Sequence, residues 1–263
     1  MHSVFAQACN IVWQDSLLTL AACGLGEGPT VLRLARGAPH DLRSLFDAGE
    51  PVDCRRGALQ TRRAELHLLH AAVWRPVPPR EGLPAVRIEA HLRLAEQRLA
   101  SHRRTHANVL DGAGAGVVAG LRDACRALDA AQALRHVARL VGWGEGLTPA
   151  GDDFLIGLIA GLDALVDGTG RRELRDALAA TLRDAAPRTT PIAAHYLRLA
   201  ADGHFAEPLL RLRDALLGED DDQVVDAALR TALDVGATSG ADTVSGLLAA
   251  LLAWSVSSRA EAA

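Results

Sequence analysis

Lysine is absent from this chain of 263 residues, so its strongly basic side chains are all arginines. A P-loop uses a lysine to reach the phosphates of a nucleotide, and Schiff-base catalysis uses a lysine amine. The sequence therefore excludes both. Any anion that the chain binds must be held by arginine, by backbone N–H groups or by a metal ion.

Aromatic residues are scarce as well, at 3% of the chain, and the net charge is −4. Proteins that bind single-stranded nucleic acid combine aromatic stacking surfaces with a positively charged groove. The sequence indicates neither feature, so we expect no nucleic-acid partner. Residues 1–141 carry an excess of arginine and residues 142–263 an excess of acid. This asymmetry would suit a ligand held between the two halves.

Paired cysteines and long hydrophobic runs are also missing. The four cysteines are widely spaced, which is typical of a reduced protein with incidental thiols. The longest apolar run, Val244–Val256, is too short to span a bilayer. Met1–Val4 lacks the basic and hydrophobic regions of a signal peptide. We therefore expect a cytoplasmic protein that does not associate with membranes.

The hydrophobic pattern predicts an α+β chain. Short apolar runs between glycine and proline turns predict a mainly antiparallel sheet or partial barrel in residues 1–80, with a first strand over Phe5–Trp13. Arg75–Pro84 is rich in proline, and we interpret it as a linker. Residues 81–263 show helical periodicity, as in Val86–Ser101, and predict a larger helical domain.

The stretch from Gly142 to Gly157, GWGEGLTPAGDDFLIG, is the strongest candidate for the chemistry. Three of its glycines stand at alternate positions: Gly142, Gly144 and Gly146. They allow sharp turns and a close approach of the backbone to a ligand. Thr148 and Pro149 predict a helix start, with the hydroxyl as cap and proline in the first turn. A loop that leads into a helix N-terminus can bind an anion, because free N–H groups and the positive dipole end point the same way.

Asp152 and Asp153 fall in the first turn of that helix, where the dipole favours negative charge. The alternative to a functional site is an ordinary capped helix whose acids serve only the dipole. One cap, however, does not require alternating glycines together with paired aspartates. Neighbouring residues on a helix point about 100° apart. We therefore expect one aspartate to face inward and the other to cap or contact the loop.

A second stretch that begins at Gly236, GATSGADTVSGLLAAL, is similar to the first. Each has Gly-x-Thr, then an aspartate four residues after the threonine, then a further glycine nine or eight residues after the threonine. Both predict a loop that leads into a helix with a face of small residues, which allows close packing. If helices 152–165 and 241–256 pack side by side in parallel, their N-termini meet at one place.

At that place Asp152 or Asp153 would face Asp242 across a pocket lined by free N–H groups. These three aspartates are the candidate catalytic residues. Asp152 and Asp242 are also candidate ligands of Mg²⁺, the one cofactor that the sequence suggests. The pocket would bind a small anion directly, or a phosphate through Mg²⁺. Its candidate ligand-binding residues are glycines and hydroxyls of the two loops: Gly144, Gly146, Thr148, Gly151, Thr238, Ser239 and Gly240.

The block GLTPAGDDF at Gly146–Phe154, with TSGAD at Thr238–Asp242, resembles a bacterial family of otherwise uncharacterised proteins. That family includes the small subunit of the anaerobic oxamate carbamoyltransferase of allantoin breakdown, a branch of purine catabolism. The resemblance extends over most of the chain. It implies an enzyme of several subunits that interconverts oxalurate plus phosphate with oxamate plus carbamoyl phosphate. The family more often has serine where this chain has Ala150, so one hydroxyl donor is missing here.

Two functions are therefore open. The favoured one is a carbamoyltransferase component that acts on a small ureido or carboxylate substrate together with partner subunits. The alternative is a non-catalytic module that binds a small anion or nucleotide and regulates or scaffolds its partners. Tight ligand binding without turnover would distinguish the second from the first. A homo-oligomer is compatible with either.

Overall fold

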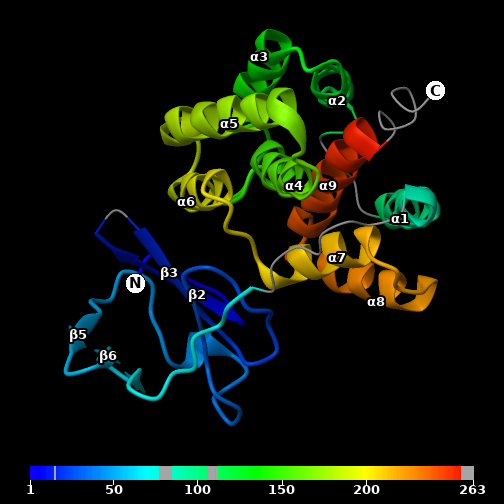
Figure 1. Cartoon of the computed structure of the whole chain (residues 1–263). Helices are drawn as coiled ribbons and strands as arrows, with labels where there is room; N and C mark the ends of the chain where they lie inside the picture. Colours follow the sequence, from blue (N-terminus) through cyan, green and yellow to red (C-terminus); the bar gives the residue numbers. More distant parts are fainter. Residues whose placement is uncertain (15, 77–84, 106–109, 111, 256–263) are drawn as a thin grey trace. The chain divides into compact units, whose positions relative to one another are not determined.

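The computed structural model describes residues 1–14, 16–76, 85–105, 110 and 112–255. The chain divides into two compact units, Met1–Val77 and Pro78–Ala263. The predicted α+β class is confirmed, because a β-rich N-terminal unit precedes a larger helical unit (Figure 1). The segment that was interpreted as a linker lies, from residue 77 to residue 84, outside the described residues.

The first sheet of the N-terminal unit has the strand order β1-β2-β3-β4. Its first two pairings are antiparallel, and β3 pairs with β4 in parallel. The prediction of a single strand over Phe5–Trp13 is wrong at its start. The backbone N–H of Phe5 donates to the carbonyl of Ala8 at 2.8 Å and closes a turn between two strands. The strands are β1 (Ser3–Val4), β2 (Ala8–Trp13), β3 (Ser16–Ala21) and β4 (Val31–Arg33).

The second sheet is antiparallel and consists of β5 (Asp53–Arg55), β6 (Ala58–Gln60) and β7 (Glu65–His67). A short 3₁₀ helix, η1 (Leu42–Ser44), lies between the two sheets in the sequence. One hydrophobic core serves the whole N-terminal unit. Its buried members come from both sheets and from η1 with the residues around it: Cys9, Ile11, Leu20, Leu34, Leu42, Phe46 and Leu59.

In the described part of the second unit, every regular element is a helix. None of its helices is long and apolar enough to cross a membrane. The helices are α1 (Ala85–Arg103), α2 (Ala115–Ala127), α3 (Ala130–Leu140), α4 (Ala150–Ala164), α5 (Gly168–Ala185), α6 (Pro191–Ala201), α7 (Glu207–Leu217), α8 (Asp222–Leu233) and α9 (Ser239–Ser255), with a 3₁₀ turn η2 (Ala186–Arg188) before α6.

Helices α4 and α9 form the centre of this unit, and they share the most extensive helix–helix contact (Figure 1). Both are apolar on nearly every side, which is typical of a helix that other helices surround. Phe154 and Leu158 on α4 and Leu247 on α9 are completely buried. Near the end of α9, the indole N–H of Trp254 donates to the carbonyl of Cys125 at 2.9 Å, so the buried ring keeps its polar atom bonded.

Glycines bring the backbones of α4 and α9 into direct contact. A Cβ atom added to Gly157 would lie 1.8 Å from the carbonyl oxygen of Thr243. A Cβ atom added to Gly246 would lie 1.8 Å from the carbonyl oxygen of Phe154. Further along α4, Gly161 approaches Ala250. Because the contact moves forward along both helices together, they run in parallel, and this prediction from the sequence is confirmed.

Alanine at either contact glycine should force the two helices apart. We expect Gly157→Ala and Gly246→Ala each to lower the free energy of unfolding by about 3 kcal/mol or more, the upper end of the usual cost of overpacking. Unfolding in urea would measure this. Gly116→Ala in α2 is the matched control, because nothing lies within 4 Å of its added Cβ. That variant should be as stable as the wild type or slightly more stable. Equal stability of all three variants would contradict the contact.

Candidate functional site

The N-termini of α4 and α9 meet at one place, as the sequence predicted. The side-chain hydroxyls of Thr148 and Ser239 lie 2.8 Å apart, and either can donate to the other. Asp153 and Asp242, from the first turns of the two helices, are only 6% and 1% exposed. Several first-turn N–H groups already have backbone partners, since Gly151 donates to Trp143 and Gly240 donates to Val235. The expected pocket of free N–H groups is therefore largely absent among the described residues, and this place combines hydroxyls with buried carboxyl groups. We call residues 148–153 and 238–242 the paired N-termini.

Each of the two helices begins against the end of the helix that precedes it. A Cβ atom added to Gly151 would lie 2.1 Å from the carbonyl oxygen of Leu140, the last residue of α3. A Cβ atom added to Gly240 would lie 2.2 Å from the carbonyl oxygen of Ala232, near the end of α8. The two glycines therefore have equivalent packing roles, and the helix–loop–helix arrangement occurs twice. Both glycines therefore allow a close approach to the end of the preceding helix.

The repeated arrangement changes which aspartates correspond. The step along the chain that takes Gly151 to Gly240 also takes Gly157 to Gly246, and it takes Asp153 to Asp242. Counting from the threonines would instead match Asp152 with Asp242. In the sequence, the glycine follows the threonine by nine residues in the first stretch and by eight in the second. This difference arises because the glycines, and not the threonines, occupy equivalent positions in the two helices. The charge of Asp242 raises the pKa of Asp153, whereas burial and the hydrogen bonds to Thr189 and Gly142 set the pKa of Asp152. This difference agrees with the match of Asp153 to Asp242.

Asp152 holds the loop that precedes α4. One carboxylate oxygen accepts the N–H of Gly142 at 2.9 Å, and the other accepts the hydroxyl of Thr189 at 2.5 Å. Burial raises the pKa of Asp152, and these two hydrogen bonds oppose the rise. The hydroxyl of Thr190 donates to the carbonyl of Leu147 at 2.5 Å and ties the same loop to the start of α6. With both oxygens engaged, Asp152 positions the loop, the role expected for one aspartate of the pair.

The prediction that Thr148 caps the N-terminus of α4 is wrong. Helix α4 begins at Ala150, and Pro149 occupies the N-cap position without a side-chain cap. The hydroxyl of Thr148 is directed to Ser239 on the other helix instead. In the repeated arrangement Ala150 corresponds to Ser239. The chain therefore has a hydroxyl at the start of α9 and none at the equivalent position of α4.

The alternating glycines allow the backbone conformation of the loop before α4. Gly142, Gly144 and Gly146 have φ values of +75°, +116° and +89°, which side chains of L-residues rarely tolerate. A Cβ atom added to Gly144 would also lie 2.8 Å from the backbone nitrogen of Ala150. Gly144 is thus needed for the approach of the loop to the helix start, whereas Gly146 is exposed and nothing lies close to it.

Asp153 has the most perturbed environment of the site. Burial raises its pKa well above the ordinary range, and the neighbouring charges of Asp242 and Asp152 raise it further. Hydrogen bonds from the hydroxyls of Ser239 and Thr148 partly offset this rise. The second carboxyl oxygen of Asp153 is buried and has no hydrogen-bond partner among the described residues. Such a carboxyl retains a proton at a pH where exposed aspartates are ionised, and it can donate that proton.

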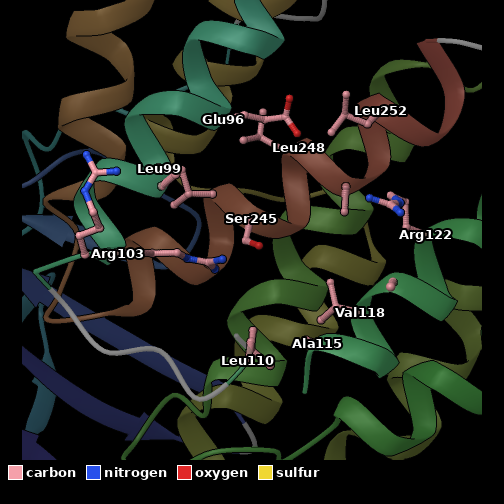
Figure 2. Close-up of a pocket in the computed structure, with 14 residues that line it drawn as sticks. Glu96, Leu99, Arg103, Leu110, Ala115, Val118, Arg122, Ser245, Leu248 and Leu252 are labelled. Carbon is pink, nitrogen blue, oxygen red and sulfur yellow. The ribbon is translucent and has the colours of Figure 1, made fainter. Parts of the chain in front are cut away.

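Arg103, at the end of α1, places a positive charge beside the paired N-termini. Its guanidinium lies 3.9 Å from a carboxylate oxygen of Asp242, and its side chain is 17% exposed. Figure 2 shows Arg103 near Ser245 of α9, one turn beyond that aspartate. No sequence motif pointed to this residue. The absence of lysine indicated that an arginine would be used, but it did not indicate which one.

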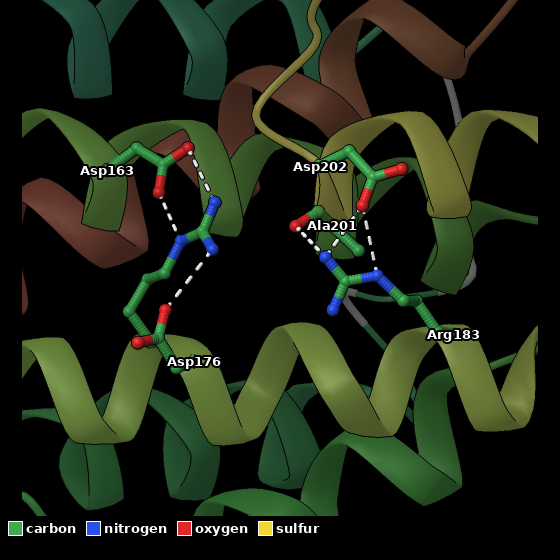
Figure 3. Close-up of polar contacts among 6 residues, drawn as sticks. Asp163, Asp176, Arg183, Ala201 and Asp202 are labelled. Carbon is green, nitrogen blue, oxygen red and sulfur yellow. Dashed lines mark hydrogen bonds and ion pairs between the residues drawn. The ribbon is translucent and has the colours of Figure 1, made fainter.

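Ion pairs from α5 hold the far ends of α4 and of α6, the helix whose start is tied to the loop (Figure 3). Arg175 donates to both carboxylate oxygens of Asp163, near the end of α4. Arg183 donates to Asp202 at 3.0 and 2.6 Å and to the carbonyl of Ala201 at 2.8 Å, where α6 ends. Bidentate arginine–carboxylate contacts fix geometry as well as adding stability. Helices α4 and α6 are therefore both secured at the end away from the loop.

Two further expectations concern Thr238 and the metal. Thr238 is exposed, and its carbonyl accepts the N–H of Asp242 at 3.1 Å at the start of α9. Among the described residues, no group of three or more His, Cys, Asp or Glu side chains could hold a metal ion. Mg²⁺ often uses only one or two carboxylates and completes its shell with substrate phosphates and water. Of the two expected ligands, Asp152 uses both carboxylate oxygens in hydrogen bonds to Gly142 and Thr189.

Fold and site together define an α+β protein whose helical unit is organised around two paired helix N-termini. The family described as "Oxamate carbamoyltransferase subunit AllH" matches residues 140–251, and the description "AllH family N-terminal domain" applies to residues 1–73. The chain belongs to this family of carbamoyltransferase subunits. The first match begins at the last residue of α3 and ends in α9, so it contains both helix starts. No solved structure matches the chain.

The buried carboxyl of Asp153 should make stability depend on pH. Because its pKa is raised in the folded state, the folded protein keeps a proton that the unfolded chain releases above about pH 4. Stability therefore falls as the pH rises from there toward the folded-state pKa. Asp153→Asn mimics the protonated form, so we expect its stability relative to the wild type to increase over that range. Denaturant unfolding at a series of pH values would measure it.

Ser239→Ala provides a comparison at the same carboxyl. It removes a hydrogen bond that lowers the pKa of Asp153, so the loss of stability should extend to higher pH than in the wild type. The two variants are thus expected to change the pH profile in opposite directions. A profile for Asp153→Asn that parallels the wild type at every pH would show that Asp153 is not the titrating group.

Proposed function

We propose that this chain is the component of a carbamoyltransferase that binds the small anionic substrate, and that the enzyme converts oxalurate and phosphate into oxamate and carbamoyl phosphate. Membership of the oxamate carbamoyltransferase subunit family supports the reaction class. The observation that carries the assignment to a site is the meeting of two helix N-termini around a buried carboxyl, Asp153, whose pKa is raised by burial. Substrates and products are small oxyanions, which helix N-termini bind well.

The reaction balances without an additional reactant. An oxygen of hydrogen phosphate forms a bond to the ureido carbonyl carbon of oxalurate. The bond from that carbon to the nitrogen of the oxamate portion then breaks. The proton lost by hydrogen phosphate is gained by the leaving nitrogen. Negative charge develops on the carbonyl oxygen in between, so the protein needs hydrogen-bond donors for an oxyanion and a group that moves one proton.

The paired N-termini can supply both requirements. The hydroxyls of Thr148 and Ser239 would donate to the developing oxyanion. Asp153, kept neutral by burial, would give its proton to the leaving nitrogen and recover one from hydrogen phosphate. Arg103 beside Asp242 adds positive charge next to the anionic substrates. Asp152 would act indirectly, by holding the loop through Gly142.

Mg²⁺ is a further part of the proposal. Carboxylate oxygens of Asp153 and Asp242, together with a substrate phosphate, are ligands that Mg²⁺ accepts. When bound, Mg²⁺ would neutralise phosphate charge, and Asp153 would be ionised. The proton-donor role and the metal-ligand role of Asp153 therefore exclude one another. Loss of activity on chelation, with recovery on adding Mg²⁺, would favour the second role.

The assay requires the chain together with the partner subunits of its enzyme, since a subunit family implies a complex. Formation of carbamoyl phosphate from oxalurate and phosphate would be measured. We expect Asp153→Asn to lower kcat by about 100-fold or more, the usual effect of removing a group that transfers a proton. Asp163→Asn is the matched control, because it makes the same change at the other end of α4, where the carboxylate pairs with Arg175. Its kcat should stay close to the wild-type value.

Other outcomes would separate the two functions. An unchanged kcat in Asp153→Asn would remove the paired N-termini from the reaction. Tight binding of oxamate or carbamoyl phosphate without turnover, even with all partner subunits present, would establish the non-catalytic alternative. Sedimentation of the isolated chain and of the complex would show whether the chain also associates with itself.

A further inference from the structure

A cavity lies between α1, α2 and α9, next to the paired N-termini but separate from them. Its volume is about 690 Å³. Figure 2 shows side chains from the three helices converging on it. Much of its wall is apolar, contributed by Leu99 of α1, Val118 of α2, and Leu248 and Leu252 of α9. A space of this volume is within the range of small-molecule sites, about 300–1,000 Å³.

The charged residues of the cavity are mainly positive. Arg103, Arg104 and Arg122 line it, and Glu96 is the one acid among the described lining residues. Figure 2 shows Arg103 and Arg122 on opposite sides of the cavity, with Ser245 of α9 between them. The guanidinium of Arg122 lies 3.4 Å from a carboxylate oxygen of Asp123, and its side chain is 40% exposed. Two guanidinium groups and a hydroxyl thus line the one cavity.

We propose that this cavity binds a small organic carboxylate with a compact apolar body. Arg103 and Arg122 would hold the carboxylate, since guanidinium groups match carboxylate geometry. The apolar body would lie against Leu99, Val118 and Leu248. Apolar walls with a few convergent polar groups are the usual composition of a small-molecule site. A wholly polar acid such as oxamate would leave those walls in contact with water, so it should not be the preferred ligand.

The cavity is linked to the paired N-termini through Arg103. The same guanidinium that lines the cavity lies 3.9 Å from Asp242. A carboxylate bound in the cavity and the carboxylate of Asp242 would both interact with the one positive charge of Arg103. Occupancy of the cavity would therefore change the electrostatic environment of the paired N-termini. The binding proposal itself is independent of carbamoyl transfer, because it depends only on the cavity and its charges.

Calorimetric titration of the full chain would test the ligand class. The probes are benzoate, its uncharged counterpart benzamide, and oxamate. We expect benzoate to bind, and benzamide to bind at least about tenfold more weakly because it lacks the charge that the arginines hold. Oxamate should also bind more weakly than benzoate. Absence of benzoate binding, equal binding of benzamide, or stronger binding of oxamate would each overturn the proposal.

Variants would locate the binding. Arg122→Gln should raise the Kd for benzoate by about tenfold. Arg126→Gln is the matched control, because Arg126 is on the same helix, contacts the same Asp123, and is 45% exposed against 40% for Arg122, but does not line the cavity. Its Kd should be unchanged. An equal loss in both variants would show general charge attraction and would overturn the proposal.

Ala119→Phe is a second, independent variant. It fills the cavity and keeps every arginine, so benzoate should no longer bind although the positive charge is intact. Thermal unfolding of each variant would show that the helical unit is still folded. Full benzoate affinity in Ala119→Phe would place the ligand elsewhere and overturn the proposal. Since no step of these experiments measures carbamoyl transfer, failure here and failure of the proposed reaction are distinguishable.

Discussion

The contact between the backbones of α4 and α9 is the constraint on which the rest of the helical unit depends. Gly157 and Gly246 allow each helix to touch a carbonyl oxygen of the other, and such close approach favours weak Cα–H···O contacts along the interface. Since the helices are parallel and in register, their first turns must lie side by side. The proximity of Thr148 to Ser239 is therefore a consequence of packing further along the helices. The same packing surrounds both helices with neighbours and removes their first turns from water.

Removal from water determines the chemistry of the site. A carboxyl group near the N-terminus of a helix is ordinarily stabilised in its ionised form. Here burial outweighs the dipole and the hydroxyl hydrogen bonds, so the pKa of Asp153 is raised. Asp242 lies close enough to add to this effect. Asp153 and Asp242 occupy equivalent positions in the repeated arrangement. Asp153 differs from an ordinary helix cap because its pKa is raised and not lowered. Arg103 provides the compensating positive charge, and through its place in the neighbouring cavity it connects the two candidate binding regions.

Much of the fold could be predicted because its signals are local. Hydrophobic periodicity and turn residues predicted the β-rich beginning and the helical remainder, and small-residue faces predicted the pairing of α4 with α9. The errors occurred where a longer-range contact altered a local preference. Thr148 has the sequence of an N-cap, yet its hydroxyl is used by Ser239 from a helix far along the chain. The sequence also left open whether Asp152 or Asp153 faces Asp242, because the register of two packed helices is not encoded in either helix alone.

The sequence by itself determined that any bound anion must be held without lysine, that two glycine-rich loops each lead into a helix with an acidic first turn, and that these helices can pack closely. These properties depend on residue type and on spacing within one segment. Only the tertiary structure decided that Asp153 faces Asp242 while Asp152 holds the loop, that Thr189 and Thr190 secure that loop, and that Arg103 and Arg122 share a cavity. The physical reason is that burial, and with it the pKa of a carboxyl and the partner of an arginine, depends on which distant segments pack around each side chain.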